Sequence, residues 1–245
     1  MNPTIETLLN HRSIRKFKDI PLTEEQRDTI ITAAQQASTS SYMMAYSIIG
    51  ITDQQKKAAL AEVSGQSYVK NNGHLLVFCA DLHRATVKAD QQDYEKMLEN
   101  LENSEHFLVS AIDAALAAQN AAIAAEALGL GICYIGSLRN NIQQVDDLLS
   151  LPQHVIPLFG MVIGVPDHQP DRKPRLPKEA VYFENEYQPH EKILDRFDDQ
   201  IQDYYKSRDS NKRLDSWTQQ MLRRFTNTMR MDVTDFVKRK GFNKR

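Results

Sequence analysis

The chain has 245 residues, of which 41% are hydrophobic and 25% charged; this ordinary globular composition excludes a disordered or fibrous protein. Its two cysteines, Cys79 and Cys133, lie in apolar runs without CxxC or Cys/His spacing, so we expect no zinc site, no disulfide framework and no other metal. The N-terminus lacks the pattern of a signal peptide, and the longest apolar stretch, 110–128, is interrupted by Asp113, Gln119, Asn120 and Glu126. We therefore expect a cytoplasmic protein that does not enter a membrane.

The formal net charge of −2 conceals an uneven distribution along the chain. Residues 201–245 hold 12 Lys and Arg against 5 Asp and Glu, so the first 200 residues are acidic. Three interpretations of this basic segment stay open: a self-neutralising solvated arm, an anion-binding element, or a nucleic-acid patch that includes 238–240 and Lys244-Arg245.

The first hundred residues predict alternating helices and strands. Pro3 favours a short helix over 3–10, and Thr23 with Gln26 forms a capping box ahead of a second helix. β-branched and apolar runs predict strands at 45–52 and 74–81, with a helix from 53 to 63 between them. Residues 88–106 are acidic and weakly periodic, which indicates a mobile helix or flap.

The stretch 110–128 contains ten alanines and is apolar on all sides, so we expect a helix that is buried all round and stopped by Gly129 and Gly131. Residues 132–136 and 158–166 predict two more core strands, followed by a loop rich in Pro, Lys and Arg and then a mostly helical tail. These elements favour an α+β fold with one core and a C-terminal helical excursion.

Several kinds of active site are missing from the sequence. The glycines at 129, 131 and 136 have the wrong spacing for GxGxxG, and no GxxxxGK[ST], GxSxG or HExxH is present. A Rossmann nucleotide site, a P-loop, a serine hydrolase and a zinc protease are therefore unsupported.

Three short clusters can instead hold an anion. His11, Arg12, Ser13 and Arg15 offer many donors, but they equally suit the cationic end of a helix. Lys173 and Arg175 are fixed by flanking prolines, although a plain basic loop has the same composition. The consecutive hydroxyls Ser38, Thr39, Ser40 and Ser41 can bind ligand oxygens or cap a turn. None of the three decides a function alone.

Together, and in this order along the chain, these segments resemble the FMN-dependent nitroreductase family, in particular its NADPH-preferring branch of oxygen-insensitive nitroreductases and NADPH–flavin oxidoreductases. The resemblance runs from about residue 4 to residue 245 and is carried by HRSIR (11–15), STSS (38–41), SGQSYV (64–69), AAQNAAIAAEALGLGICYIGSLRN (117–140), LPQHVIPLFG (151–160), PDRKPRLP (170–177) and YYKSRDSNKR (204–213). It implies a nitroreductase-like homodimer, with an antiparallel-rich central sheet flanked by helices and FMN in clefts between protomers. We expect residues 1–200 to form the FMN-binding core and 201–245 a basic extension of the same domain.

The resemblance also implies which residues bind FMN. Arg15 matches the position beside N1 of the flavin ring, where a cation stabilises the negative charge of reduced FMN. The hydroxyl stretch is supplied from the partner chain, and Thr39 keeps a hydroxyl where this branch commonly has serine. Ser137 replaces a glycine common in the branch. The implied FMN-binding residues are His11, Arg12, Ser13, Arg15, Ser38, Thr39, Ser40, Ser41, Gln66, Tyr134, Ile135, Gly136, Ser137, Lys173 and Arg175.

For NADPH, the resemblance assigns Arg208 and Arg213 to its 2′-phosphate, and Glu105 and Arg230 to the neighbourhood of the acceptor pocket. The implied activity is a ping-pong, two-electron reduction of nitroaromatics, quinones or free flavins. Two alternatives remain: a non-catalytic or sensory flavin-binding protein on the same scaffold, and a nucleic-acid-associated protein that uses the basic tail. We expect a small-molecule acceptor, with neither nucleic acid nor membrane as a partner.

Overall fold

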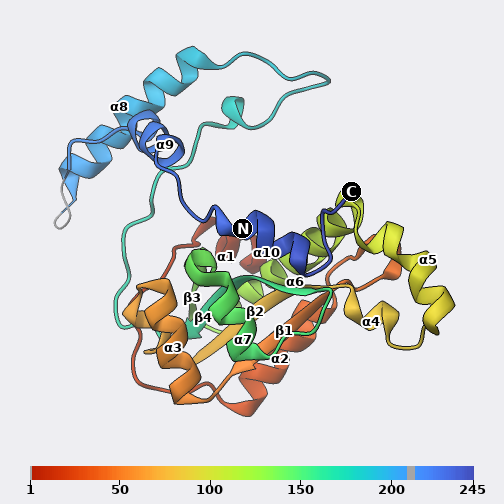
Figure 1. The fold of residues 1–245 in the computed structure, drawn as a ribbon. Coiled ribbons are helices and arrows are strands. Elements are labelled where there is room, and N and C mark those ends of the chain that lie inside the picture. The colour runs from red at the N-terminus through yellow and green to blue at the C-terminus, as the bar shows by residue number, and fades with distance from the viewer. Residues whose placement is uncertain (1, 209–212) are drawn as a thin grey trace. The chain divides into compact units, whose positions relative to one another are not determined.

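The computed structural model describes residues 2–208 and 213–245 (Figure 1). Chain contacts divide the protein into two compact units. Unit 1 comprises Met1–Pro170 and Arg230–Arg245, and unit 2 comprises Asp171–Met229. The division into a core of residues 1–200 and an extension of 201–245 stays a prediction.

Unit 1 contains the one sheet of the described residues, in which four strands pair in the order β1-β2-β4-β3. Every neighbouring pair is antiparallel, which confirms the expected antiparallel-rich sheet. Three strands lie within one residue of their predicted bounds, whereas β4 begins three residues before the predicted 158 and ends two residues before 166. The strands are β1 (Tyr46–Ile51), β2 (His74–Asp81), β3 (Gly131–Ile135) and β4 (Val155–Gly164).

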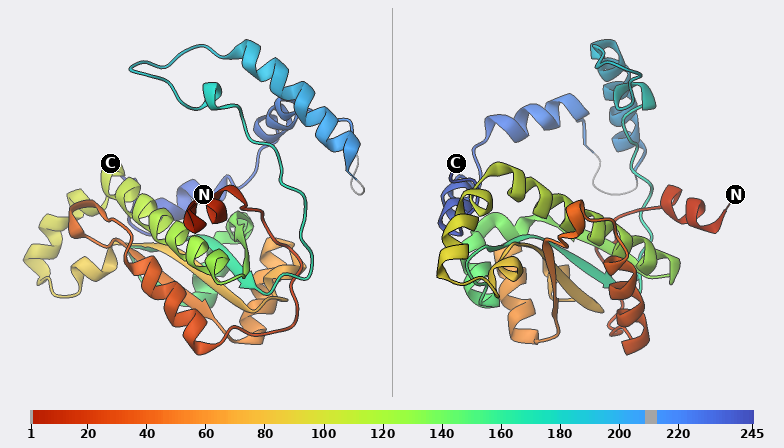
Figure 2. Two further views of the ribbon diagram at one scale, coloured as in Figure 1. Left: turned by 180° about the vertical axis from the view of Figure 1, so that it is seen from behind. Right: turned by 90° about the vertical axis from the view of Figure 1, so that its right-hand side faces the viewer.

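Helices cover both faces of this sheet. On one face, α2 (Glu24–Gln35) and α6 (Ser104–Ala127) pack against alternate β2 residues that include Leu76 and Phe78 (Figure 2). On the other face, α3 (Gln54–Ser64) and α7 (Ile142–Leu149) cover the intervening residues Leu75 and Val77. Since side chains alternate across a strand, one continuous apolar run supplies both cores.

Helix α6 begins at Ser104, six residues before the predicted start, because the Asn103 side chain accepts a hydrogen bond from the His106 amide and caps it. Its alanines are buried against α2 and the sheet. The opposite face is not buried in the single chain: Leu108, Ile112 and Leu116 are 52%, 55% and 43% exposed. Among the described helices, α6 alone is long and apolar enough to cross a membrane, a test that core helices of soluble proteins also pass.

The other helices of unit 1 are short. The sequence 88–106, expected as a mobile helix or flap, contains the helix α5 (Gln91–Leu101), capped by Asp90, and the start of α6, while its mobility stays a prediction. Helix α1 (Pro3–Leu9) precedes α2, whose Thr23–Gln26 capping box is confirmed. The remaining helices are α4 (His83–Thr86) and α10 (Asp232–Arg239).

Unit 2 has a small core of its own. Helix α8 (Glu191–Ser207) buries Phe197, Ile201 and Tyr205, which pack with Trp217 at the start of α9 (Trp217–Thr226). The chain then returns to unit 1, where α10 and the residues after it bury Phe236 and Phe242. The predicted helical tail is confirmed for the described residues.

Candidate functional site

The segment His11–Arg15, called the cationic turn below, lies along the outer edge of β3. The Ile14 amide donates to the Ile132 carbonyl at 2.8 Å, and the Lys18 amide donates to the Val165 carbonyl at 2.9 Å. Gly131 permits this approach, because a Cβ there would lie 2.5 Å from the Ile14 side chain. The main chain that carries the cations is thus held to the sheet almost like an additional strand.

Side chains of the cationic turn alternate between two environments, as they do along an extended chain. Arg12 and the buried Ile14 line a groove of about 980 Å³ that is also lined by α1 and residues 166–169. Ser13 and Arg15 lie on the other side, beside Cys133. The four polar residues predicted to act together are therefore divided between two sides of the turn.

The Arg15 side of the turn contains two residues that sequence reasoning did not assign, Tyr68 and Cys133. Burial raises the Tyr68 pKa, and the Arg15 guanidinium opposes this shift. Burial also raises the Cys133 pKa, again opposed by Arg15. Gln66 is two residues before Tyr68 and begins the short helical turn Ser67–Val69. The SGQSYV segment thus brings a phenol beside Arg15, with the predicted glutamine close by in sequence.

The side chains of His11 and Arg12 have partners within the protein. His11 Nδ1 lies 2.7 Å from Glu126 Oε1 at the end of α6, and Arg12 donates through Nε to the Asn10 carbonyl at 3.2 Å. Arg12 also donates to the Pro170 carbonyl at 3.4 Å. Glu126 was noted only as a polar interruption of the apolar stretch, since its partner is 115 residues away.

The segment Tyr134–Ser137 continues from Cys133 along the same strand. Tyr134 is exposed at its edge, packs edge-on to Phe159 at 5.7 Å between ring centroids, and donates to Gln119 at 3.4 Å. Burial raises the Tyr134 pKa to about 12. Ile135 is buried, and Gly136 and Ser137 begin the helical turn Gly136–Asn141. The structure therefore brings this predicted segment and Arg15 to one edge of the sheet.

Ser38–Ser41, the hydroxyl turn, lies elsewhere in unit 1. It precedes β1, where Tyr46 pairs with Ala80 near the end of β2. The cationic turn contacts Ile132, which pairs with Ile163, which in turn pairs with His74 at the start of β2. The strands next to the two turns, β1 and β3, are the two edge strands of the sheet, and the positions on β2 that correspond to the turns lie at opposite ends of that strand, ~20 Å apart.

The hydrogen-bond donors of the predicted site residues are chemically suited to an anionic, hydroxyl-rich group such as FMN. Arginines and a histidine bind phosphate well, and hydroxyls and a glutamine amide suit a sugar-alcohol chain and a pyrimidine edge. In geometry, however, one chain keeps its cationic turn and its hydroxyl turn apart. A site that uses both sets needs two copies of the chain.

Unit 2 carries the other predicted cations. Lys173 Nζ and Arg213 Cζ lie 5.7 and 4.4 Å from the centre of the Tyr205 ring, and Arg208 Cζ lies 5.7 Å from the Tyr204 ring. Arg175 donates to the Lys173 carbonyl at 2.8 Å. Unit 2 thus gathers Lys173, assigned to FMN, with Arg208 and Arg213, assigned to NADPH. The middle of the YYKSRDSNKR motif, residues 209–212, lies outside the described residues.

The basic tail is used inside unit 1. Lys240 Nζ lies 2.9 Å from Asp146, and Lys244 Nζ lies 2.7 Å from Glu102, to which Arg245 also donates. Hydrogen bonds from Lys244 hold the Glu102 pKa below its usual range. These contacts favour the self-neutralising interpretation for this part of the basic segment.

Glu105 and Arg230 are the two residues predicted to lie near the acceptor pocket. Glu105 is exposed in the first turn of α6. Arg230 Nε donates to Asn140 Oδ1 at 3.0 Å from a left-handed backbone. The roles of both stay predictions. Within residues 2–208 and 213–245, no group of three or more His, Cys, Asp or Glu side chains is arranged to hold a metal ion.

This fold and its cation-bearing edge define a flavin-reductase type of oxidoreductase scaffold, and the chain belongs to the nitroreductase family. The model of the nitroreductase family matches residues 8–165, and the model of that family's C-terminal domain matches residues 173–245. The family resemblance and the nitroreductase-like fold are confirmed.

Individual relatives extend over the whole chain. The chain is 51% identical to the FMN reductase (NADPH) of Bacillus subtilis strain 168, with 100% of both chains covered. It is 44% identical to the oxygen-insensitive NADPH nitroreductase of Salmonella typhimurium, with 99% of both covered. Among solved structures, the NADPH:FMN oxidoreductase of Vibrio harveyi, complexed with NAD⁺, matches with a TM-score of 0.89 at 41% identity, and 100% of both chains is covered.

Proposed function

We propose that this protein is an NADPH-dependent FMN oxidoreductase that reduces nitroaromatics, quinones or free flavins by two electrons in a ping-pong cycle. The relatives named FMN reductase and nitroreductase, at 51% and 44% identity over essentially the whole chain, support this activity. The observation in the fold that supports it best is Arg15, exposed on a turn that the Ile14–Ile132 hydrogen bond fixes to the sheet.

In this proposal the protein binds and orients the cofactor and the substrates, and the cofactor supplies the redox chemistry. FMN, when bound, accepts and passes on two electrons. Arg15 would place a positive charge beside the flavin's pyrimidine edge, and its guanidinium interacts with the Tyr68 hydroxyl. Lys173 and Arg175 bind the FMN phosphate. Arg208 and Arg213 bind the 2′-phosphate of NADPH, since guanidinium groups form charge-assisted hydrogen bonds with a dianion.

The proposal includes a homodimer. The opposite placement of the cationic and hydroxyl turns supports it, because a second copy can bring its hydroxyl turn to the first copy's cations. The exposed stripe Leu108, Ile112 and Leu116 on α6 supports it too, since a partner would cover this apolar face. A cytoplasmic location is supported by the buried free thiols of Cys79 and Cys133.

The activity is tested by the visible spectrum of the purified protein. We expect a flavin spectrum that bleaches on anaerobic addition of NADPH, bleaches more slowly with NADH, and recovers when a nitroaromatic or quinone is added. A yellow protein that NADPH does not bleach would support the non-catalytic alternative. A colourless protein that does not take up FMN would contradict the proposal as a whole.

The dimer is tested by Ile112→Glu, which introduces a charge into the exposed stripe of α6. Burying an unpaired carboxylate is costly, so we expect a monomer in sedimentation velocity and loss of bound FMN. Val87→Glu, the same change from a neutral apolar residue to a carboxylate at an exposed position outside the stripe, should leave the dimer intact. A dimeric Ile112→Glu protein would exclude this face as the interface.

A further inference from the structure

The backbone after the hydroxyl turn is unusual in its conformation. Ser41, Tyr42 and Met44 all have left-handed φ angles, of 51°, 59° and 47°. Residues with a Cβ adopt this region reluctantly, so three such residues within four positions persist only where the surroundings enforce them. Tyr42 is 84% exposed at the tip, and Ser40 and Ser41 are exposed beside it.

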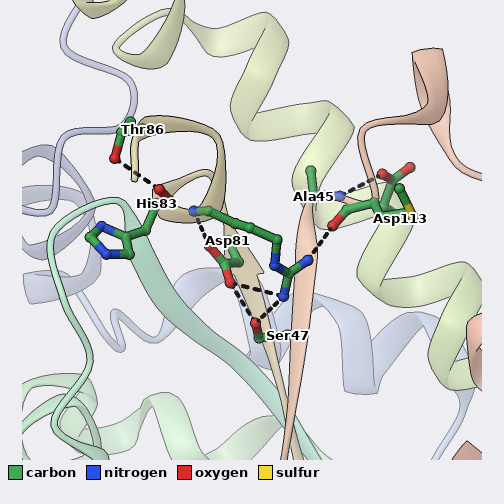
Figure 3. A network of polar contacts seen from close by, with 8 residues as sticks. Ala45, Ser47, Asp81, His83, Thr86 and Asp113 are labelled. Carbon is green, nitrogen blue, oxygen red and sulfur yellow. Dashed lines mark hydrogen bonds and ion pairs between the residues drawn. The ribbon is translucent and has the colours of Figure 1, made fainter. Parts of the chain in front are cut away.

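One carboxylate closes the base of this loop. Asp113, on α6, is 1% exposed and accepts a hydrogen bond from the Ser40 amide at 3.0 Å. It also accepts one from the Ala45 amide at 3.0 Å (Figure 3). One oxygen serves the start of the strained segment and the other serves its end. Asp113 thus fixes the distance between the two ends of the loop and does not itself reach a ligand.

A second contact holds the middle of the loop. Arg84, on α4, donates through one guanidinium nitrogen to the Met44 carbonyl at 3.0 Å. Through the other nitrogen it donates to the Ser47 hydroxyl at 3.0 Å and lies 3.5 Å from Asp81 (Figure 3). Ser47 in turn donates to Asp81. The planar guanidinium therefore ties the left-handed Met44 peptide to two strands of the sheet.

We propose that Asp113 and Arg84 are positioning residues for the flavin: they hold the 40–45 loop in the left-handed form that presents the hydroxyl turn to FMN bound on a second copy of the chain. The inference rests on the proposed function. Both residues act through main-chain amides and a carbonyl, so their effect reaches FMN through Ser40 and Ser41. Without them, the loop relaxes toward ordinary backbone conformations and the hydroxyls lose their fixed direction.

The first test measures FMN affinity in Arg84→Met, which keeps an unbranched apolar side chain and removes the guanidinium donors. Arg84 is exposed, so this variant is expected to fold. We expect the dissociation constant for FMN, from fluorescence titration of the apoprotein, to rise about ten-fold, the size expected for a lost charge-assisted hydrogen bond. The melting temperature of the apoprotein and the kcat of the FMN-saturated enzyme should stay close to wild type.

Asp113→Asn gives the second variant, because the amide can accept only one of the two backbone hydrogen bonds and offers a donor to the other. We expect an equal or larger rise in the FMN dissociation constant. Asp53→Asn is the matched control, since Asp53 also accepts two backbone amides but caps α3 instead. Lys56→Met is the control for Arg84, since Lys56 also donates to a main-chain carbonyl, that of Leu148. Both controls should bind FMN like the wild type.

A rescue experiment separates positioning from general stabilisation. Asparagine adopts left-handed backbone more readily than methionine does. Adding Met44→Asn to Arg84→Met should therefore restore the FMN dissociation constant to within about three-fold of wild type. Restoration would show that the conformation of the loop, rather than the guanidinium itself, carries the effect.

The outcomes distinguish failure of the proposed function from failure of the positioning role. A wild-type protein that does not bind FMN would remove the proposed function and this inference together. A wild type that binds FMN, with Arg84→Met binding it equally well, would overturn the positioning role and leave the function intact. A lower apoprotein melting temperature with unchanged FMN affinity would also overturn it. If Asp113→Asn does not fold, Arg84→Met decides.

Discussion

The two cation-bearing regions of the molecule are built in different ways. The cationic turn of unit 1 is held by main-chain hydrogen bonds to the edge strand β3 and to the end of β4. The cations of unit 2 lie instead against the rings of Tyr204 and Tyr205, and the core of the described part of this unit is a small cluster of Phe197, Ile201 and Tyr205. A strand-anchored turn suits a cofactor that stays bound, whereas a thinly packed unit suits a substrate that must enter and leave.

The largest effect that separates the two regions is expected from Phe197→Ala. It removes a buried ring from the small core of unit 2, where Phe197 packs against Trp217, and should cost about 3–5 kcal/mol. Trp217 is the only tryptophan of the chain, so its fluorescence during denaturation reports on unit 2. Phe225→Ala, at an exposed position of the same unit, should have little effect. An unchanged transition of the Trp217 fluorescence in Phe197→Ala would contradict the role of this ring in the core of unit 2.

Acid should weaken the sheet under the cationic turn. Burial, helped by the positive charges of Lys57 and Arg27, lowers the pKa of His74 from 6.5 to about 4. The unfolded chain then binds the proton more tightly than the folded one, so stability falls as the pH drops from about 6.5 to about 4, by about 3 kcal/mol in all. His74→Asn should flatten this part of the pH dependence, measured by urea denaturation. An unchanged profile would remove His74 as its cause.

Arg15→Ala tests the anchored region directly. Loss of a charged donor should raise the FMN dissociation constant about 10–100-fold, which corresponds to about 1.5–3 kcal/mol. The rate of flavin reduction at saturating FMN should also fall, because the positive charge beside the flavin is gone. Lys70→Ala, which removes an exposed cation elsewhere in unit 1, provides the control. Unchanged FMN content and reduction rate would exclude Arg15 from the site.

Arg208→Ala tests unit 2 and is expected to have the smallest effect. The KM for NADPH should rise about ten-fold, as for one lost charge-assisted hydrogen bond, while the KM for NADH stays nearly constant. Steady-state kinetics with both nucleotides measure this difference, and Arg196→Ala on α8 serves as the control. Equal changes in the KM values for NADPH and NADH would contradict the assignment of Arg208 to the 2′-phosphate.

Local signals in the sequence predicted the framework of unit 1 well. The run 74–81 is apolar between two polar ends and became β2 with those bounds, and Thr23 and Gln26 formed the capping box that their spacing indicates. The start of α6 was missed because its cap, Asn103, lies in an acidic stretch without clear periodicity. The bounds of an element were thus predicted where its apolar run or capping pair is clear in the local sequence, and missed where it is not.

Long-range pairings in the candidate site could not be predicted in the same way. Asp113 looked like an interruption of an apolar helix, but it serves amides 73 and 68 residues earlier in the chain. The proximity of Tyr68 and Cys133 to Arg15 likewise depends on how the strands pair. The separation of the cationic and hydroxyl turns follows from strand order and register, which residue types alone do not encode.

The return of the chain to unit 1 after unit 2 also constrains how the protein forms during synthesis. Phe236 and Phe242 are part of the unit 1 core. In the same segment, Lys240 forms an ion pair with Asp146 and Lys244 forms one with Glu102. A nascent chain that has emerged only as far as unit 2 therefore still exposes the apolar surface that these side chains cover. Folding of the first 170 residues finishes only after residues 230–245 leave the ribosome, so ribosome-stalled intermediates should be open to proteases and to chaperones that bind apolar segments.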